Sequence, residues 1–357
     1  MNRHSQSSGD NSTQLSASGD IIIGITEERA REISTIVARQ VIEKYAEEGL
    51  TVIQDRIIKL DDRVLAELIR QGRLEVFADP GFQRAYRTAQ ESAAVSDAET
   101  DYDLLAGLII KRTEANNDRF QNTTIEQCIS LIDKIDIRAL QALTVLYATS
   151  YVSPIAPSMK DGLDAYESFL TRLIEFELPR SHTWIEHLDS LNIIRINHFS
   201  IPNSFEKELT TGMSGYVSRG APRFGPTAPL TYTNASEQYP PLTIPHELRP
   251  EFDRFAAASP SGWISLRELP GLRGMPDEQH QAIQREAEEK YDFGKVDESL
   301  IPAFMKEVRN RPMLKLVEEW RSALPVGILF TMTSRTLAAV NAHRLDPNFE
   351  LPETPEW

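Results

Sequence analysis

The stretch from Thr26 to Leu68, "TEERAREISTIVARQVIEKYAEEGLTVIQDRIIKLDDRVLAEL", decides the fold class. Its apolar residues recur three or four positions apart, which is the period of an amphipathic helix. Thr26 suits a helix N-cap, and Glu27 and Glu28 suit the positive end of a helix dipole. The apolar stripe consists of Ile33, Ile36, Val37, Val41 and Tyr45, followed after Gly49 by Val52, Ile53, Ile57, Leu60, Val64, Leu65 and Leu68. We therefore expect a mainly α fold.

A polar leader precedes this helix. Residues 1–20 are rich in Ser, Asn, Asp, Gln and Gly, and they cannot bury enough apolar surface to order on their own. The isoleucines around Gly24 are β-branched and predict a short strand. A lone strand leaves its backbone groups unpaired, so we expect it to pair with the same strand in other copies. The predicted self-association residues are Gly19, Asp20, Ile21, Ile22, Ile23, Gly24 and Ile25.

An alternative for the leader remains open. Residues 1–20 could form a disordered tail, with the strand packed inside its own subunit against residues 193–201. Deleting residues 1–25 and measuring the mass in solution separates the two possibilities, because an unchanged oligomer size refutes the self-association hypothesis.

The helical period continues to about residue 178, with six or so amphipathic helices joined by short loops. Ser96 with Glu99, and Thr123 with Glu126, have the spacing of capping boxes that open two of these helices. Cys128 falls on the apolar side of the second, which predicts a buried packing thiol rather than a nucleophile. This part of the chain is expected to be a helical bundle.

The pattern changes beyond residue 178. A short helix, a turn at Asn192 and two short β-rich runs, Ile193–Ile196 and Phe199–Ile201, resemble a small winged-helix-like unit. The fold class we expect is a mainly α helical bundle with an N-terminal β-strand leader and this small winged-helix-like β element. The predicted segments are a leader and strand (1–25), a helical bundle (26–178), the winged-helix-like unit (179–211), a Gly/Pro-rich loop region (212–275), and C-terminal helices with a tail (276–357), in which Pro312 must kink or interrupt a helix.

Composition and charge exclude several classes of protein. The 357 residues include 53 acidic and 38 basic ones, giving a formal net charge of −15 that disfavours nucleic acid in the absence of a basic patch. A single cysteine cannot form an internal disulfide. We find neither a signal-peptide pattern nor an apolar run long enough to span a membrane. We therefore expect a cytoplasmic protein.

No pattern in the sequence points to a chemistry. His182, Glu186, His187 and His198 are the best metal candidates, but His182 and His187 are five positions apart, about 140° around a helix, and capping or surface roles fit them better. No phosphate-binding loop or dinucleotide fingerprint occurs. Trp184 and Trp320 have apolar neighbours at helical spacing, which predicts core positions. We expect no catalytic, cofactor-binding or metal-binding residues, and no cofactor.

A resemblance adds to this interpretation. The leader "GDNSTQLSASGDIIIGIT", then "FADPGFQRAYRTAQESAAVSDAETDYDLLAGLIIKRTE" and "ALQALTVLYATSYV", together with "HLDSLNIIRI" and "LPVGILFTMTSRTLAAVNAHR", resemble an uncharacterised bacterial family named only by locus tags. More distantly they are similar to the Abi-alpha group associated with abortive infection. Two positions depart from that pattern: Asn192 replaces a glycine, which Asn can do because it also visits left-handed conformations, and Pro325 replaces a hydroxyl residue. The resemblance implies a bacterial origin and a part in antiviral defence, and it carries no catalytic residues.

Three functions remain open at this point. The first is a non-enzymatic bacterial defence or stress-response protein that acts through self-association and protein-protein interaction, as a homo-oligomer formed by the N-terminal strand. The second is a nucleic-acid-sensing regulator that uses the winged-helix-like segment, and the salt dependence of DNA or RNA retention tests it. The third is an enzyme with a site in residues 212–275, which a screen of nucleotide turnover tests.

Overall fold

A computed structural model describes residues 27–115, 118–199, 204–223, 242–265, 273–349 and 351–352. The contacts divide the chain into two units, residues 1–55 and 56–357. Thirteen α-helices dominate the described residues, which confirms the mainly α expectation. The predicted strand around Ile21–Ile25, its self-association residues from Gly19 onward and the predicted cap Thr26 lie outside the described residues.

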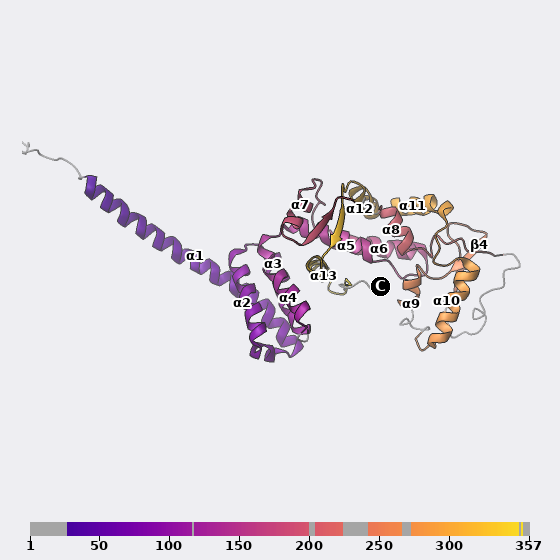
Figure 1. The fold of residues 1–357 in the computed structure, drawn as a ribbon, viewed down its shortest axis with the longest axis horizontal. Helices are drawn as coiled ribbons and strands as arrows, with labels where there is room; N and C mark the ends of the chain where they lie inside the picture. The colour runs from indigo at the N-terminus through magenta and orange to yellow at the C-terminus, as the bar shows by residue number, and fades with distance from the viewer. Residues whose placement is uncertain are drawn as a thin grey trace, which may run out of the picture. The chain divides into compact units, whose positions relative to one another are not determined.

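The first helix spans the whole of the predicted apolar stripe. α1 (Glu27–Gln71) runs for 45 residues without a break, and Gly49 lies inside it (Figure 1). Leu60, Val64 and Leu68 repeat every four residues and are fully buried. N-terminal to them, in the stretch up to Asp55, the described side chains are exposed. The apolar stripe of this helix is thus buried only near its C-terminal end.

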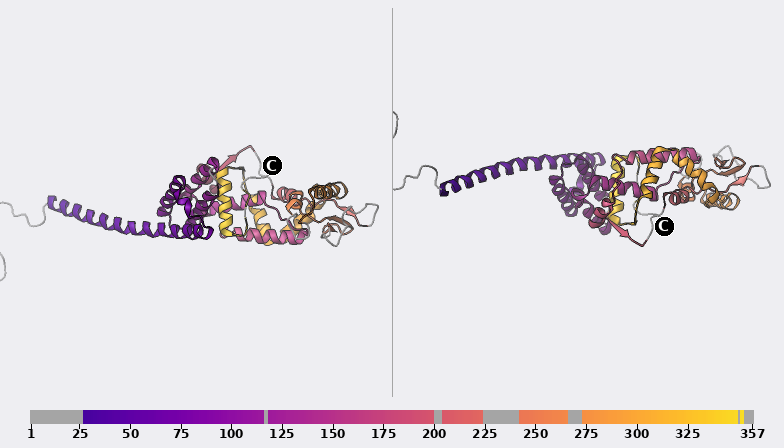
Figure 2. Two further views of the ribbon diagram at one scale, coloured as in Figure 1. Left: turned by 90° about the horizontal axis from the view of Figure 1, so that it is seen from below. Right: turned by 90° about the horizontal axis from the view of Figure 1, so that it is seen from above.

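A first hydrophobic core lies among helices of the N-terminal half and one C-terminal helix. α13 (Met332–Leu345) packs against four helices of the predicted bundle, and Figures 1 and 2 show it beside the bundle. Segments about 200 residues apart in sequence therefore complete one core. The other elements of this part are η1 (Leu74–Ala78), α2 (Pro80–Val95), α3 (Glu99–Glu114), α4 (Arg119–Ile129), η2 (Ile132–Lys134) and α5 (Ile137–Tyr151).

The helix starts differ from the predicted capping boxes. α4 begins at Arg119, where the Asp118 carboxylate accepts hydrogen bonds from two backbone N–H groups, so Thr123 lies inside the helix and its hydroxyl donates to Arg119 O. Ala98, not Ser96, is the N-cap residue of α3. An aspartate just before a helix accepts hydrogen bonds from the free N–H groups of the first turn as well as Ser or Thr does. A helix can therefore begin at such an aspartate even where a Ser or Thr with the spacing of a capping box lies nearby.

A second core joins the middle and the end of the chain. It lies among α6 (Met159–Leu173), α8 (Phe205–Gly212), η4 (Glu298–Leu300), α11 (Ile301–Arg309), α12 (Pro312–Ser322) and parts of α5 and α13. Pro312 is the first residue of α12, and α11 ends three positions before it. The predicted interruption at this proline is therefore confirmed, because the missing N–H costs nothing in a first turn.

The predicted winged-helix hairpin is not shown. After α7 (Thr183–Ser190), β1 (Ile194–Asn197) pairs antiparallel with β5 (Gly327–Phe330), and Ile194 lies opposite Phe330. Of the expected second strand, Phe199 lies in a turn and Ile201 is outside the described residues. The turn between α7 and β1 agrees with the sequence, because Asn192 adopts a φ of 58°, in the left-handed region where Asn can replace glycine.

The region predicted as Gly/Pro-rich loops contains regular structure in its described parts. β4 (Phe252–Phe255) is the central strand of a three-stranded antiparallel sheet with β2 (Ala221–Pro222) and β3 (Thr243–Pro245). A third hydrophobic core joins this sheet to α9 (Pro260–Ser265) and α10 (Asp277–Tyr291). Trp263 is buried there, edge to face with Phe255 at 5.0 Å between ring centroids.

One buried histidine beside this sheet predicts a pH dependence of stability. His246 Nε2 donates to Ser218 O at 2.8 Å, and the Leu248 N–H donates to Nδ1 at 3.2 Å, so the neutral ring has both nitrogens paired. Burial lowers the pKa of His246, with the positive charges of Arg254 and Arg249 acting in the same direction, while the Ser218 bond and Glu247 oppose the shift. The folded protein therefore takes up this proton less readily than the unfolded chain, whose histidine pKa is about 6.5.

We expect the stabilising contribution of His246 to be complete above about pH 6.5 and to be lost as the pH falls from there through the lowered folded pKa. Urea unfolding measured from about pH 7.5 down to about pH 5, a range that spans the unfolded histidine pKa of about 6.5, follows this decline. His246→Asn keeps an acceptor for the Leu248 N–H and does not titrate, so its unfolding free energy is expected to decline less steeply. Identical pH profiles for the two proteins would contradict the prediction.

Candidate functional site

The N-terminal stretch of α1, residues 27–55, is the first candidate and is called the α1 arm below. Eight of its large apolar side chains are 38–66 % exposed. By contrast, Leu60, Val64 and Leu68 further along the same helix are fully buried. Exposed apolar residues that are scattered singly are ordinary, but a contiguous set marks an interaction surface. The eight residues are Ile36, Val37, Val41, Ile42, Tyr45, Leu50, Val52 and Ile53.

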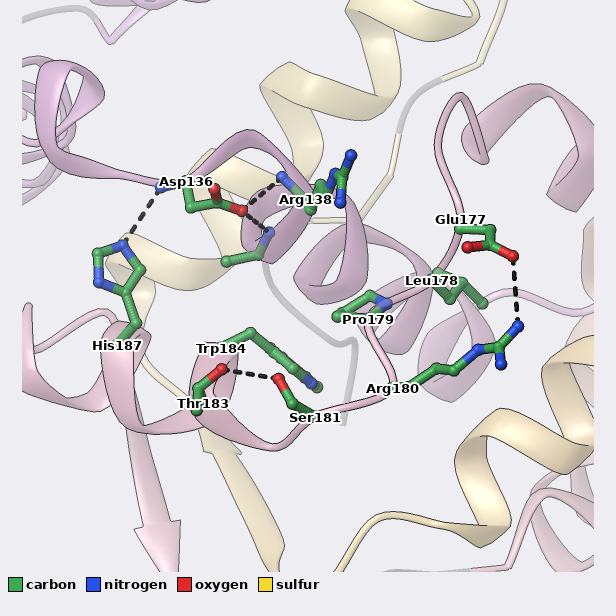
Figure 3. Close-up of a pocket in the computed structure, with 11 residues that line it drawn as sticks. Asp136, Arg138, Glu177, Leu178, Pro179, Arg180, Ser181, Thr183, Trp184 and His187 are labelled. Carbon is green, nitrogen blue, oxygen red and sulfur yellow. Dashed lines mark hydrogen bonds and ion pairs between the residues drawn. The ribbon is translucent and has the colours of Figure 1, made fainter.

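The second candidate is a cavity of about 450 Å³ between α5 and α7, called the Trp184 pocket below. Figure 3 shows its lining residues, which come from the start of α5, from the segment before α7, and from α7 itself. The cavity lies within the second unit of the chain. Its walls are formed by Asp136, Arg138, Ala139, Glu177, Leu178, Pro179, Arg180, Ser181, Thr183, Trp184 and His187.

Trp184 lines this pocket, and a second tryptophan stacks on its ring. The rings of Trp184 and Trp320 stack with centroids 5.9 Å apart and planes 26° apart. The Trp320 indole N–H donates to Pro179 O at 3.1 Å, which ties the segment before α7 to α12. Trp184 is 5 % exposed, and Trp320 packs against the same core, as predicted. The pocket wall is therefore part of the protein core.

Most polar groups around the Trp184 pocket already have partners. The Asp136 carboxylate accepts from the backbone N–H groups of Arg138 and Ala139 at 2.9 and 3.0 Å. His187 Nε2 accepts from the Asp136 N–H at 3.2 Å, so its unprotonated nitrogen supports the start of α5. The remaining contacts in Figure 3 are an ion pair between Arg180 and Glu177 at 3.3 Å and a hydroxyl contact between Ser181 and Thr183 at 2.8 Å.

Two donors in the pocket have no partner. The Trp184 Nε1–H is buried and forms no hydrogen bond. Arg138, at the start of α5, forms no side-chain hydrogen bond or ion pair with any described residue. In addition, α7 has no side-chain N-cap, so the N–H groups of its first turn depend on other acceptors. The Trp184 N–H is therefore buried without an acceptor, whereas Arg138 is exposed.

The histidines proposed as metal candidates do not converge. His182 Nε2 contacts Ala323 O at 3.1 Å, at the C-terminal end of α12, while His187 accepts from the Asp136 N–H at the start of α5, so each pairs with the backbone at the end of a helix. Within the described ranges, no group of three His, Cys, Asp or Glu side chains could hold a metal ion. Cys128 is fully buried in the first core, which confirms the packing role predicted for it.

Sequence reasoning missed both candidate surfaces. The stripe of α1 was predicted, but periodicity cannot show where along the stripe the burial ends. The Trp184 pocket joins residues about 40 positions apart, and Trp184 was assigned to the core without regard to its polar edge. The one usable signal was the aspartate before α5, which marks a helix start. Among helices in the described ranges, none has the length and apolar composition that a membrane crossing requires.

The comparisons with other proteins give a family but no function. A family model described only as a "-like" family, without an activity, matches residues 24–323. No curated protein and no solved structure matches the chain. No link to the Abi-alpha group is found. Since the match covers most of the chain, the protein belongs to this uncharacterised family.

Proposed function

We propose that this protein is a non-enzymatic bacterial defence or stress-response component that acts through self-association and partner binding. The observation that carries the proposal is the α1 arm, with eight exposed large apolar side chains in 18 residues, from Ile36 to Ile53. In proteins, most of the stability of a helix comes from packing of its apolar face against another surface. A helix of this composition therefore gains stability when a second surface covers it.

The occupant proposed for the α1 arm is the α1 arm of a second copy. The N-terminal half of the arm, residues 27–41, has three arginines and three glutamates, which sum to zero charge. The C-terminal half, residues 42–55, has four acidic residues and one lysine, which sum to −3. A parallel in-register pair would align −3 with −3, whereas an antiparallel pair aligns each acidic half with a neutral half. Because like charges along a helix pair are destabilising, the charges favour an antiparallel pair of arms.

The predicted leader strand would add a second contact. Ile21–Ile25 lie directly before the arm in sequence, so an association of arms raises the local concentration of the strands. The role in defence rests on the sequence resemblance alone, and it is proposed together with self-association because both rely on assembly of copies.

We expect the full chain to sediment as an oligomer of its 40.3 kDa subunit, and we expect Val41→Glu with Tyr45→Glu to shift it to the monomer. Both substitutions place charges on the apolar face, and glutamate has a helix propensity at least as good as that of valine or tyrosine. Sedimentation velocity gives the mass, and far-ultraviolet circular dichroism checks that the helix content is retained.

The matched control is Lys44→Glu, which changes the net charge by −2 as the double substitution does and lies on the same arm. It breaks only an exposed pair with Glu48, 3.7 Å long, so the oligomer should persist. Monomeric unmodified protein, or equal dissociation in control and variant, would contradict the proposal. Deleting residues 1–25 tests the leader separately, and infection of cells that carry the gene or the double variant tests the role in defence.

A further inference from the structure

We propose that β5 accepts the predicted leader strand of a second copy, Ile21–Ile25, as a third strand of its sheet. The inference deepens the proposed self-association and rests on it, because it names the surface to which the leader of one copy binds on another. It starts from the two-stranded sheet of β1 and β5, which lie side by side in Figure 1. Among the described residues, β1 is the only strand that pairs with β5.

The outer edge of β5 has backbone groups without partners. Ile196 N donates to Asp189 Oδ1 at 3.2 Å, so this N–H points away from β5. Residues directly opposite in an antiparallel ladder exchange both hydrogen bonds or neither, so Ile328, opposite Ile196, also turns its N–H and C=O groups outward. Phe330 does the same two positions on, and neither residue has a backbone hydrogen bond on that side in the described part of the chain. Since backbone groups are almost always paired or hydrated, this edge is open to water in the single chain.

The two edges of the sheet differ in their suitability for a further strand. On β1, the Asp189 carboxylate already occupies the outward N–H of Ile196. Charged side chains on an edge are one of the means by which proteins prevent edge-to-edge pairing. The four residues of β5, Gly327–Phe330, carry no charge, and Leu329 is 55 % exposed. Of the two edges, that of β5 therefore suits an added strand.

The leader matches this edge in composition and length. Ile21–Ile25 contains four β-branched side chains and no charged residue, and β5 is four residues long. One face of the sheet packs on the first core through Ile196, Ile328 and Phe330. Because successive side chains of a strand point to opposite faces, every second side chain of an added leader strand would extend this apolar face.

β5 is also a better partner for the leader than the leader of another copy. An isolated pair of strands is marginally stable in water, whereas a third strand on a sheet that packs against helices adds to an existing core. The proposed antiparallel arms bring the N-terminal end of one arm beside the C-terminal end of the other. That end continues within α1 to Leu60, Val64 and Leu68 of the first core, on which the sheet of β5 also packs. The strand that reaches β5 is therefore assigned to the second copy.

Hydrogen–deuterium exchange of the full chain, read by mass spectrometry, tests the pairing. We expect the outward amides of Ile328 and Phe330 to exchange about tenfold or more slowly in the unmodified protein than in Ile23→Pro, because proline removes a donor and interrupts the leader strand. Gln14→Pro is the matched control, since it places the same residue in the polar part of the leader. It should leave the exchange of β5 unchanged.

A mixture of two variants shows whether the strand comes from another copy. Ile328→Pro removes an outward N–H and leaves the bonds to β1 intact, so this variant keeps its leader but has a blocked edge. When it is added to Ile23→Pro, the Phe330 amide of the latter should regain slow exchange. Ile328→Ala loses the same side-chain packing but keeps the N–H, so alone it should retain the slow exchange at Phe330 that Ile328→Pro loses.

The outcomes separate this inference from the self-association on which it rests. If Ile23→Pro is not rescued in the mixture, or if it exchanges at Phe330 as the unmodified protein does, β5 is not the partner of the leader. When the protein nevertheless sediments as an oligomer, the pairing of the α1 arms still holds. A full chain that sediments as a monomer contradicts the self-association as well.

Discussion

Replacing Arg254 by alanine is expected to lower the free energy of unfolding by about 3 kcal/mol, because the change empties a fully buried position and takes the donor away from the Glu247 carboxylate and two backbone carbonyls. Arg254 lies on β4 and is fully buried. Its Nε and Nη2 donate to the two Glu247 oxygens at 2.6 and 2.7 Å. Its guanidinium also lies over the Tyr216 ring, 4.9 Å from the centroid. The substitution removes all these contacts together.

The same arginine joins three parts of the chain. Arg254 Nη2 donates to Pro157 O at 2.8 Å, just before α6, and Nη1 donates to Phe255 O at 2.9 Å. Glu247 also accepts from Met159 N at 2.8 Å, in the first turn of α6. Burial raises the pKa of Glu247, but the hydrogen bonds and the charge of Arg254 outweigh it and hold that pKa below its ordinary value. The carboxylate is thus ionised in the native pair, and removal of Arg254 takes away the main groups that hold its pKa down.

Urea unfolding measures this loss, with Arg223→Ala as the matched control. Arg223 pairs with Asp253 on the neighbouring strand at 3.1 Å, but both side chains are about one-third exposed. A partly exposed pair contributes roughly 0–1 kcal/mol, so the control should unfold at nearly the same urea concentration as the unmodified protein. Equal losses for the two substitutions would show that the Arg254 network does not carry the stability assigned to it.

Local patterns predicted the elements better than their limits or partners. The apolar period of α1 and the proline at the start of α12 are short-range signals, and the structure agrees with both. Helix starts were less certain, because Asp118 and Thr123 both suit a cap and sequence does not show which one does so. The pairing of β1 with β5 joins segments 130 residues apart, which no local pattern contains.

The candidate sites show the same division. The exposure of Tyr45 depends on what else in the fold reaches its face of α1, and the Trp184 pocket depends on how α5 and α7 meet. Neither follows from residue types alone. The residues around Arg254 illustrate why: nothing in the sequence near this arginine indicates burial, yet it is buried because Glu247 and three carbonyl or ring contacts pair with it.

A second large effect is expected at Gly215, between α8 and β2. Gly215→Ala should lower the free energy of unfolding by about 3 kcal/mol or more, because a Cβ atom there would overlap the backbone. Built on the existing backbone, that Cβ lies 2.1 Å from Ala257 O and 2.9 Å from Ala258 O. Neither oxygen can move by a side-chain rotation. The two segments would have to separate, and the hydrogen bond from Gly215 N to Ala258 O, 2.7 Å long, would be lost.

Gly49→Ala is the matched control for this substitution. Gly49 lies inside α1, and a Cβ there would meet no atom within 4 Å. Alanine restricts the unfolded chain and favours the helix, so the control should not lower stability and should stabilise the helix by about 0.5–1 kcal/mol. Thermal unfolding of the two variants separates overlap from the general effect of adding a methyl group. Gly215 has no positive φ, so backbone conformation does not explain a loss of stability on substitution by alanine. If Gly215→Ala unfolds at the same temperature as the unmodified protein, the two segments do not approach as closely as described.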